Sequence, residues 1–420
     1  MSTYKSSRYI PFDQRKDDSK ILIVNCGSSS IKLTIFDIDN GTFTRQLDAH
    51  LKGINSQQPT LEITYSGGQE STVFTKKIGI AEGLQLIFDV IKRKFDFSFS
   101  SLLGIGHRFV HGGNRYLSST RIDQTVITEL ETLSSLAPLH NDACLIGIKE
   151  CFNLAKFTPQ VAVFDTAFHN SLPAVASNYA IAMDIASQHE IKRYGFHGIS
   201  NAFLWNTYEN HVGQDAQNSK IITFHLGNGC SITAIQGGLS VDTSMGFTPA
   251  EGLVMATRAG DIDAAVVEFL CLHDKKSPSE IMEQLNFQSG LLGISGVSSD
   301  MKTLLALSID NERARLAVDM FCYRALKYLG AYMTILSGAD AIIFSGGIGE
   351  NSPMIRDLIM RKMEWYGSQM DSEANQQAVG LSPGAVQRIS TSSSTVAIYV
   401  IASDENLFIA REVQRILFAG

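Results

Sequence analysis

The chain has 420 residues, a length that favours two domains, because single hydrophobic cores rarely grow past about 250–300 residues. Its hydrophobic content of 44% is typical of a globular protein, and its net charge of −7 argues against a general nucleic-acid binder, which needs a basic face. The polar first 19 residues and the lack of a run of about 18 apolar residues predict no secretion signal and no membrane span.

Apolar runs rich in β-branched residues predict strands, and apolar residues at helical spacing predict helices. The predicted strands cover residues 20–25, 31–37, 161–164, 221–225, 231–235, 341–345 and 396–401. The predicted helices cover residues 79–94, 124–136, 142–155, 263–272, 312–336 and 404–418. Because the two types alternate along the chain, the sequence predicts an α/β fold. Residues 1–18 fit neither pattern and are interpreted as an N-terminal extension.

The six cysteines show no zinc-site spacing, since none forms a CxxC pair and none has a histidine partner at a typical interval. They are Cys26, Cys144, Cys151, Cys230, Cys271 and Cys322. In a chain of this length, such cysteines are interpreted as reduced, mostly buried thiols of a cytoplasmic protein.

Two loops with matching surroundings lie 200 residues apart. Residues 21–37 read ILIVNCGSSSIKLTIFD, and residues 221–235 read IITFHLGNGCSITAI, with Gly27 and Gly227 at the same place in each. Small residues allow backbone N–H groups to approach an anion closely, and serine and asparagine add donors. The repeat suggests two related domains whose loops bind a nucleotide phosphate chain, although an ordinary tight hairpin accounts for the first loop equally well.

A third loop, FSGGIGENS at 344–352, follows a predicted strand and opens a helix, a geometry in which backbone N–H groups bind anions. It matches neither GxGxxG nor the Walker A pattern, so neither a Rossmann nor a P-loop site follows.

Five charged or imidazole side chains interrupt apolar sequence between these loops. They are Arg108 in GHRFVHGG, His140 in APLHN, Asp165 in FDTAFH, His197 in RYGFHG and Arg258 in the segment 243–263. One such histidine alone is more often a hydrogen-bonded structural residue than a functional one. Five of them beside three glycine-rich loops favour a functional site, and the chemistry fits phosphoryl transfer to a small acid, in which cationic groups stabilise a spread negative charge.

These motifs, together with SGLLGISGVSSDM, GGIGENS and the terminal SDENLFIAR, cover about residues 20–412. In this order they resemble the acetate kinases of the acetokinase family, within the superfamily of acetate and sugar kinases, chaperone ATPases and actin. The resemblance implies a two-domain actin-like ATPase fold with duplicated ββαβαβα-type domains and a central nucleotide cleft. It implies a first domain of residues 19–167 plus 402–420, a second domain of residues 168–401 that forms a homodimer, and no nucleic-acid or membrane partner.

The resemblance also implies an activity, namely reversible transfer of the ATP γ-phosphoryl group to acetate, with Mg²⁺, or Mn²⁺ in its place, as the metal. The motif positions implied to be catalytic are Asp165, His197 and Arg258. Those implied to bind the acid are Arg108, Val110, Leu139, His140, Phe196 and Pro249, of which the apolar members surround the methyl group. Those implied to bind the nucleotide are Ser28, Ser30, Lys32, His225, Leu226, Gly227, Asn228, Gly229, Asp300, Met301, Lys302, Gly347, Ile348, Gly349, Glu350 and Asn351. Asn25 and Glu405 match the magnesium-site residues.

The chain departs from the family motifs at several positions. Asn114 replaces a glutamate after HGG, Lys302 replaces an arginine near the expected adenosine, and Asn201 replaces the histidine that ends RYGFHGTSH. Two alternatives remain open beside acetate kinase. One is a kinase that prefers propionate or another short acid, and the other is an ATP-switched interaction protein of the chaperone or actin type.

Overall fold

The computed structural model describes residues 19–99 and 102–418, so the predicted extension at residues 1–18 lies outside the described residues. The chain divides into two compact units. The first unit runs to Ala167 and resumes at Glu405, and the second comprises Phe168–Asp404.

The first unit contains one eight-stranded sheet. Its strands are β1 (Lys20–Cys26), β2 (Ser30–Asp39), β3 (Thr42–Lys52), β4 (Thr60–Tyr65), β5 (Gly68–Val73), β6 (Gly104–Phe109), β7 (Thr120–Ile122) and β8 (Gln160–Phe164), in the spatial order β5-β4-β3-β2-β1-β6-β8-β7. Strands β1, β6 and β8 are parallel to one another, and β1 to β5 form an antiparallel meander. The helices of this unit are α1 (Ile80–Phe95), α2 (Gln124–Thr132), α3 (Pro138–Leu154) and α15 (Glu405–Phe418).

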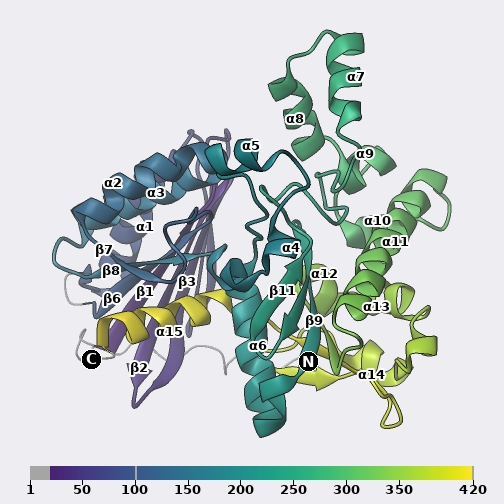
Figure 1. Cartoon of the computed structure of the whole chain (residues 1–420). Helices are drawn as coiled ribbons and strands as arrows, with labels where there is room; N and C mark the ends of the chain where they lie inside the picture. The colour runs from purple at the N-terminus through teal and green to yellow at the C-terminus, as the bar shows by residue number, and fades with distance from the viewer. Residues whose placement is uncertain (1–18, 100–101, 419–420) are drawn as a thin grey trace. The chain divides into compact units, whose positions relative to one another are not determined.

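Helices cover both faces of this sheet. Helix α1 buries Leu84, Ile87 and Ile91, which are three or four residues apart and therefore share one face, against the inward side chains of β2 and β3. Helix α15 packs on β1, β6 and β8. Figure 1 shows α15 on the side of the sheet opposite to α1 and α3. The C-terminal helix thereby brings its first residue, Glu405, to the central parallel strands.

The second unit contains a six-stranded sheet in the order β11-β10-β9-β12-β14-β13. Its strands are β9 (Lys220–Leu226), β10 (Cys230–Gln236), β11 (Leu239–Thr243), β12 (Ala341–Ser345), β13 (Val386–Arg388) and β14 (Ala397–Ile401). Its helices are α4 (Ala174–Ser177), α5 (Met183–Gln188), α6 (Gly198–Val212), α7 (Ala265–Asp274), α8 (Pro278–Phe287), α9 (Gly290–Ser295), α10 (Met301–Leu307), α11 (Glu312–Ile335), α12 (Gly346–Asn351), α13 (Pro353–Met360) and α14 (Ser372–Gln377).

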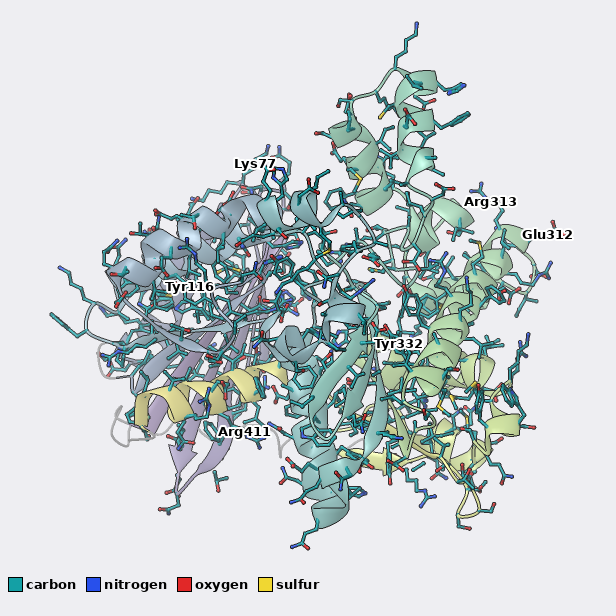
Figure 2. The ribbon with its side chains drawn as sticks, viewed as in Figure 1. Lys77, Tyr116, Glu312, Arg313, Tyr332 and Arg411 are labelled. Atoms are coloured by element: carbon teal, nitrogen blue, oxygen red, sulfur yellow. The ribbon has the colours of Figure 1, made fainter. Side chains whose placement is uncertain are left out.

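The long helix α11 supports the sheet of the second unit. It contacts β9 and β10, while α6 contacts β9 and β13. Figure 2 labels Tyr332 on α11, whose ring is buried and whose hydroxyl donates a hydrogen bond to Asp242 Oδ1 in β11 at 3.4 Å. The predicted helix at 312–336 is thus a core helix of this unit.

The two sheets share one topology. In each sheet, three parallel strands lie next to two strands of an antiparallel meander. The spatial order is β3-β2-β1-β6-β8 in the first unit and β11-β10-β9-β12-β14 in the second. The predicted α/β class and its duplicated ββαβαβα-type arrangement are confirmed. Two helix predictions need correction: the helix placed at 142–155 begins at Pro138, and the one placed at 124–136 ends at Thr132 and continues as a 3₁₀ turn, Leu133–Leu136.

The six cysteines are free, and all except the half-buried Cys271 are buried. Among the residues that the structure describes, no helix is both long and apolar enough to cross a membrane.

Candidate active site

In the first unit, three candidate residues lie at the carboxyl ends of adjacent parallel strands. Val24 pairs with His107 across β1 and β6, so Asn25 and Arg108 follow at the same edge. Arg108 pairs in turn with Val163 in β8, and Asp165 follows that strand directly. The carboxyl edge of parallel strands is where open α/β sheets bind ligands. The fold therefore gathers side chains from three distant motifs at a ligand-binding edge.

Arg108 and Asp165 form an ion pair. The Nε of Arg108 donates to Asp165 Oδ2 at 3.0 Å, and its Nη2 donates to the same oxygen. The Asp165 side chain is 2% exposed and that of Arg108 is 24% exposed. Burial by itself would lower the pKa of Arg108, but the carboxylates of Asp165 and Glu405 together raise it. Arg108 therefore stays charged, and Asp165 orients it while leaving part of the guanidinium accessible.

The segment after Arg108 is held by a residue that was not among the sequence candidates. Buried Asn141 accepts a hydrogen bond from the His111 N–H at 3.1 Å and donates to the His111 carbonyl at 3.2 Å. The same amide donates to the Leu133 carbonyl at 3.0 Å. These bonds fix the backbone next to Val110. The motif APLHN contains Asn141, so the motif pointed to this segment without indicating its role.

The second unit repeats the layout with different residues. His225 is a half-buried residue near the end of β9, a strand whose central residues are all buried, and it pairs with Ser345 of β12. The loop Gly227–Gly229 closes with a hydrogen bond from Gly227 N to Gly229 O at 3.0 Å, just as Gly27 N donates to Ser30 O at 2.8 Å in the first unit. In both loops predicted from the sequence, a glycine N–H thus bonds a carbonyl across the turn, but the turn of the second unit is one residue shorter.

Two histidines and an arginine converge on the loop Gly227–Gly229. The rings of His197 and His225 lie 4.2 Å apart at 31°. The Nδ1 atom of His197 bonds the Ser231 hydroxyl at 2.9 Å, and that of His225 bonds the Ser200 hydroxyl at 2.8 Å. The Nδ1 atoms are thus both engaged, and it is the Nε2 atoms that turn towards the loop.

The position of Gly229 shows how closely these groups approach. A Cβ atom placed there would lie 3.3 Å from His197 Nε2 and 3.6 Å from Arg258 Nη1. Arg258 is held by its hydrogen bond to the Pro249 carbonyl at 3.2 Å. One imidazole and one guanidinium therefore flank a glycine loop, an arrangement suited to stabilising negative charge on a transferred phosphoryl group.

A cavity of about 760 Å³ adjoins the same loop. Eight of the predicted nucleotide residues line it: Gly227, Asn228, Asp300, Met301, Lys302, Gly347, Ile348 and Asn351. Five further lining residues were not predicted: Leu305, Ser352, Pro353, Met354 and Gln376. Its size and its mixture of apolar walls and polar groups are typical of a small-molecule site.

Predicted nucleotide residues also hold the loops around this cavity in place. Leu226 and Gly349 are buried. Glu350 Oε1 accepts hydrogen bonds from the N–H groups of Gly346 at 2.9 Å and Ser403 at 3.1 Å. Asp300 caps α10 by accepting from Thr303 N at 2.8 Å, and hydrogen bonds from Thr303 lower its pKa. These side chains hold the loops in place.

The remaining candidates divide between the two units. Ser28, Ser30 and Lys32 belong to the β1–β2 hairpin, Val110 is buried, and His140 lies half-buried on the first turn of α3. In the second unit Phe196 is buried and Pro249 is half-buried. The side chain of Leu139 lies outside the described residues.

The described residues contain no cluster of three or more histidine, cysteine, aspartate or glutamate side chains placed to hold a metal ion. Asn25 and Glu405 supply an amide and a carboxylate, which are oxygen ligands of the kind that Mg²⁺ prefers. Magnesium commonly takes only one or two protein ligands and completes its shell with water and phosphate oxygens. This pair therefore fits a metal that is held jointly with a nucleotide.

Comparison with known proteins agrees with these features. The model of the acetokinase family matches residues 20–411. An acetate kinase of Helicobacter hepaticus is 41% identical over 94% of this chain and 98% of its own. The crystal structure of a Porphyromonas gingivalis acetate kinase has a TM-score of 0.87 at 37% identity, over 95% of this chain and all of that one.

A Francisella tularensis propionate kinase structure has a TM-score of 0.86 at 35% identity, over 94% of this chain and 98% of that one. These likenesses confirm the actin-like ATPase fold expected from the motifs. Together with the family match over nearly the whole described chain, they show that the protein belongs to the acetokinase family.

Proposed function

We propose that the protein is an acetate kinase, which transfers the γ-phosphoryl group of ATP to acetate, reversibly, to give acetyl phosphate and ADP. The observation that carries this proposal is the convergence of His197 and Arg258 on the loop that borders the 760 Å³ cavity. A nucleotide in that cavity would present its phosphates to these groups. The family match supports ATP and ADP as the nucleotide pair.

The acceptor needs no general base. Acetate is already ionised at pH 7, so its oxygen can attack phosphorus directly. We assign Arg108 to the acetate carboxylate, because a guanidinium binds carboxylates through two donors and Asp165 fixes its orientation. His197 and Arg258 stabilise the charge that spreads over the equatorial oxygens in the transition state. Transfer is direct and in line, so it inverts the configuration at phosphorus.

Asn25 and Glu405 would hold Mg²⁺ with the nucleotide phosphates. When bound, the ion would neutralise phosphate charge and help to orient the γ-phosphoryl group. Mn²⁺ has the same preference for oxygen ligands and serves as a substitute.

A hydroxylamine assay tests the proposal. Wild-type protein with MgATP, acetate and hydroxylamine should accumulate acetyl hydroxamate, because hydroxylamine traps acetyl phosphate. Intact ATP binding without any hydroxamate would contradict a kinase and favour an ATP-switched interaction protein.

Propionate is the second candidate acceptor, since the propionate kinase resembles this chain almost as closely as the acetate kinases do. We assign the methyl group of acetate to the apolar side chains of Val110, Phe196 and Pro249, the proposed acyl wall. One methylene in such a pocket changes binding by about 1–3 kcal/mol. Acetate should be the best substrate, propionate usable and butyrate poor, as kinetics with the three acids would show.

We also propose a homodimer formed through the second unit and a cytoplasmic location. Helix α7 buries none of its residues, and its Val266, Phe269 and Leu272 are 39%, 56% and 70% exposed. A second copy would cover this apolar face. Light scattering should give twice the chain mass, and Phe269→Glu should give a monomer. The six free cysteines fit a reducing compartment.

A further inference from the structure

His197 has an unusual backbone conformation for a residue with a side chain. Its φ of 57° and ψ of 25° lie in the left-handed region, and it occupies the N-cap position of α6. Such a conformation is unfavourable for a non-glycine residue and persists only where surrounding contacts enforce it. The imidazole direction therefore depends on what fixes this backbone.

Asn201 contacts this backbone directly. The His197 carbonyl accepts hydrogen bonds from both the backbone N–H and the side-chain Nδ2 of Asn201, each at 2.9 Å. The Asn201 Oδ1 atom accepts a hydrogen bond from the Thr223 hydroxyl at 2.6 Å. Asn201 is 1% exposed and Thr223 is fully buried. The amide thus links the first turn of α6 to the strand that carries His225.

The orientation of this amide is determined by its two partners. A carbonyl requires a donor and the threonine hydroxyl supplies one, so Nδ2 must face His197 and Oδ1 must face Thr223. An ionised aspartate side chain has the same shape but no side-chain donor for the His197 carbonyl. A valine at position 223 keeps the shape of threonine but removes the hydroxyl.

Thr223 and His225 are two residues apart on β9 and therefore face the same side of the sheet. On the neighbouring strand, Ser231 pairs with His225 and Thr233 pairs with Thr223. The hydrogen bonds of Asn201 and Ser231 thus hold His197 at two points, one on its backbone and one on its ring.

We infer that Asn201 is a positioning residue of the phosphoryl-transfer site, which holds His197 in its left-handed conformation and is itself oriented by Thr223. The inference rests on the proposed function for its kinetic consequence. Asn201 is not among the residues that line the cavity, so we expect it to act through the alignment of His197.

Three variants test this inference by kinetics. Asn201→Asp and Thr223→Val should each lower kcat by about 10-fold to 100-fold, because sub-ångström misalignment carries losses of this order. The KM values for ATP and acetate should stay within about two-fold, since neither residue binds substrate. The double variant should be no slower than Asn201→Asp, because the Thr223 hydroxyl reaches His197 through the Asn201 amide.

Thr223→Ser should retain wild-type kcat, because it keeps the hydroxyl. Thr233→Val is the matched control, since it removes a buried hydroxyl directly opposite Thr223 that bonds Thr243 and not Asn201. It should alter melting temperature but not kcat. Equal loss of kcat in Thr223→Val and Thr233→Val would overturn the inference, as would wild-type kcat in Asn201→Asp.

A spectroscopic measurement separates this inference from the proposed function. In ¹H–¹⁵N spectra of the imidazole rings, Asn201→Asp should shift the His197 signals, and Thr233→Val should leave them unchanged. These shifts are expected whether or not acetyl phosphate is formed. An inactive wild-type protein would therefore refute the proposed kinase function but not the positioning role of Asn201. Unshifted His197 signals in Asn201→Asp would refute the positioning role alone.

Discussion

Replacing Gly346 by alanine should weaken nucleotide binding more than an alanine at any other glycine of the third loop, residues 344–352. Gly346 has a φ of +77°, and an added Cβ would lie 2.7 Å from the Leu226 carbonyl oxygen and 2.8 Å from its nitrogen. Both contacts are with backbone atoms, which cannot rotate away. Leu226 directly precedes Gly227, which lines the cavity, so the displacement passes to the cavity that we propose binds the nucleotide.

The expected magnitude has two parts. A side chain in the left-handed region costs about 1–2 kcal/mol. Forcing an extra methyl group into a packed contact costs a further 1–3 kcal/mol or so. The variant Gly41→Ala separates the backbone cost from the packing cost. Gly41 has a φ of +80°, close to that of Gly346, but nothing lies within 4 Å of its added Cβ. Gly41→Ala should therefore show only the first cost.

Calorimetric titration with ATP and thermal melts of both variants provide the assay. Gly346→Ala should melt below Gly41→Ala and bind ATP at least about 10-fold more weakly than wild type, as expected for a displaced site. Gly41→Ala should bind ATP normally. If the two variants melted alike and bound ATP alike, the close packing of Gly346 on Leu226 would not matter for the site.

Arg258→Ala should lower kcat by about 10³-fold with little change in the KM for ATP, as for other arginines that stabilise transferring phosphoryl groups. Arg108→Ala should lower kcat and raise the KM for acetate. Steady-state kinetics test both variants, and a near wild-type kcat in each would contradict the roles assigned to Arg258 and Arg108. Val110→Ala should raise the propionate-to-acetate ratio of kcat/KM, whereas an unchanged ratio would remove Val110 from the acyl wall. Burial lowers the pKa values of His107 and His169 to about 4, so the unfolded chain binds more protons below about pH 6.5 and stability falls as pH falls. Urea unfolding should show a loss of about 2 kcal/mol per histidine between pH 7 and pH 5, and a flat profile would contradict neutral burial.

The sequence predicted best the strands that are buried on both faces. Strands such as β8 (QVAVF) and β12 (AIIFS) are continuous apolar runs, and every residue in them is buried. It missed β3 to β5, because β3 mixes charged residues with apolar ones and all six residues of β5 are exposed. It also missed β6, whose two glycines weaken a strand pattern.

The motifs pointed to the candidate site residues, but they did not reveal the hydrogen-bond partners of these residues. Asp165 and Arg108 are 57 residues apart, and His197 and Ser231 are 34 apart, so only the fold shows that they meet. The sequence showed Asn201 as a departure from the motif, but it did not indicate that the Asn201 amide bonds the His197 carbonyl.

Arg356 gave no signal in the sequence at all. It is fully buried and donates to the carbonyls of Gly349 and Asn375, each at 2.7 Å, which ties α12 to α14. Burial lowers its pKa to about 10. A buried arginine paired with backbone carbonyls leaves no complementary acidic residue for a sequence pattern to reveal.

The most direct test of the account is the fate of the oxygen atoms of acetate. With ATP, Mg²⁺ and ¹⁸O-labelled acetate, ³¹P NMR should show acetyl phosphate whose phosphorus signal is shifted by a bridging ¹⁸O, with one ADP formed for each molecule. That result requires a carboxylate oxygen to have attacked the γ-phosphorus. Conversion of ATP to ADP and inorganic phosphate without acetyl phosphate, or acetyl phosphate with an unshifted signal, would contradict it.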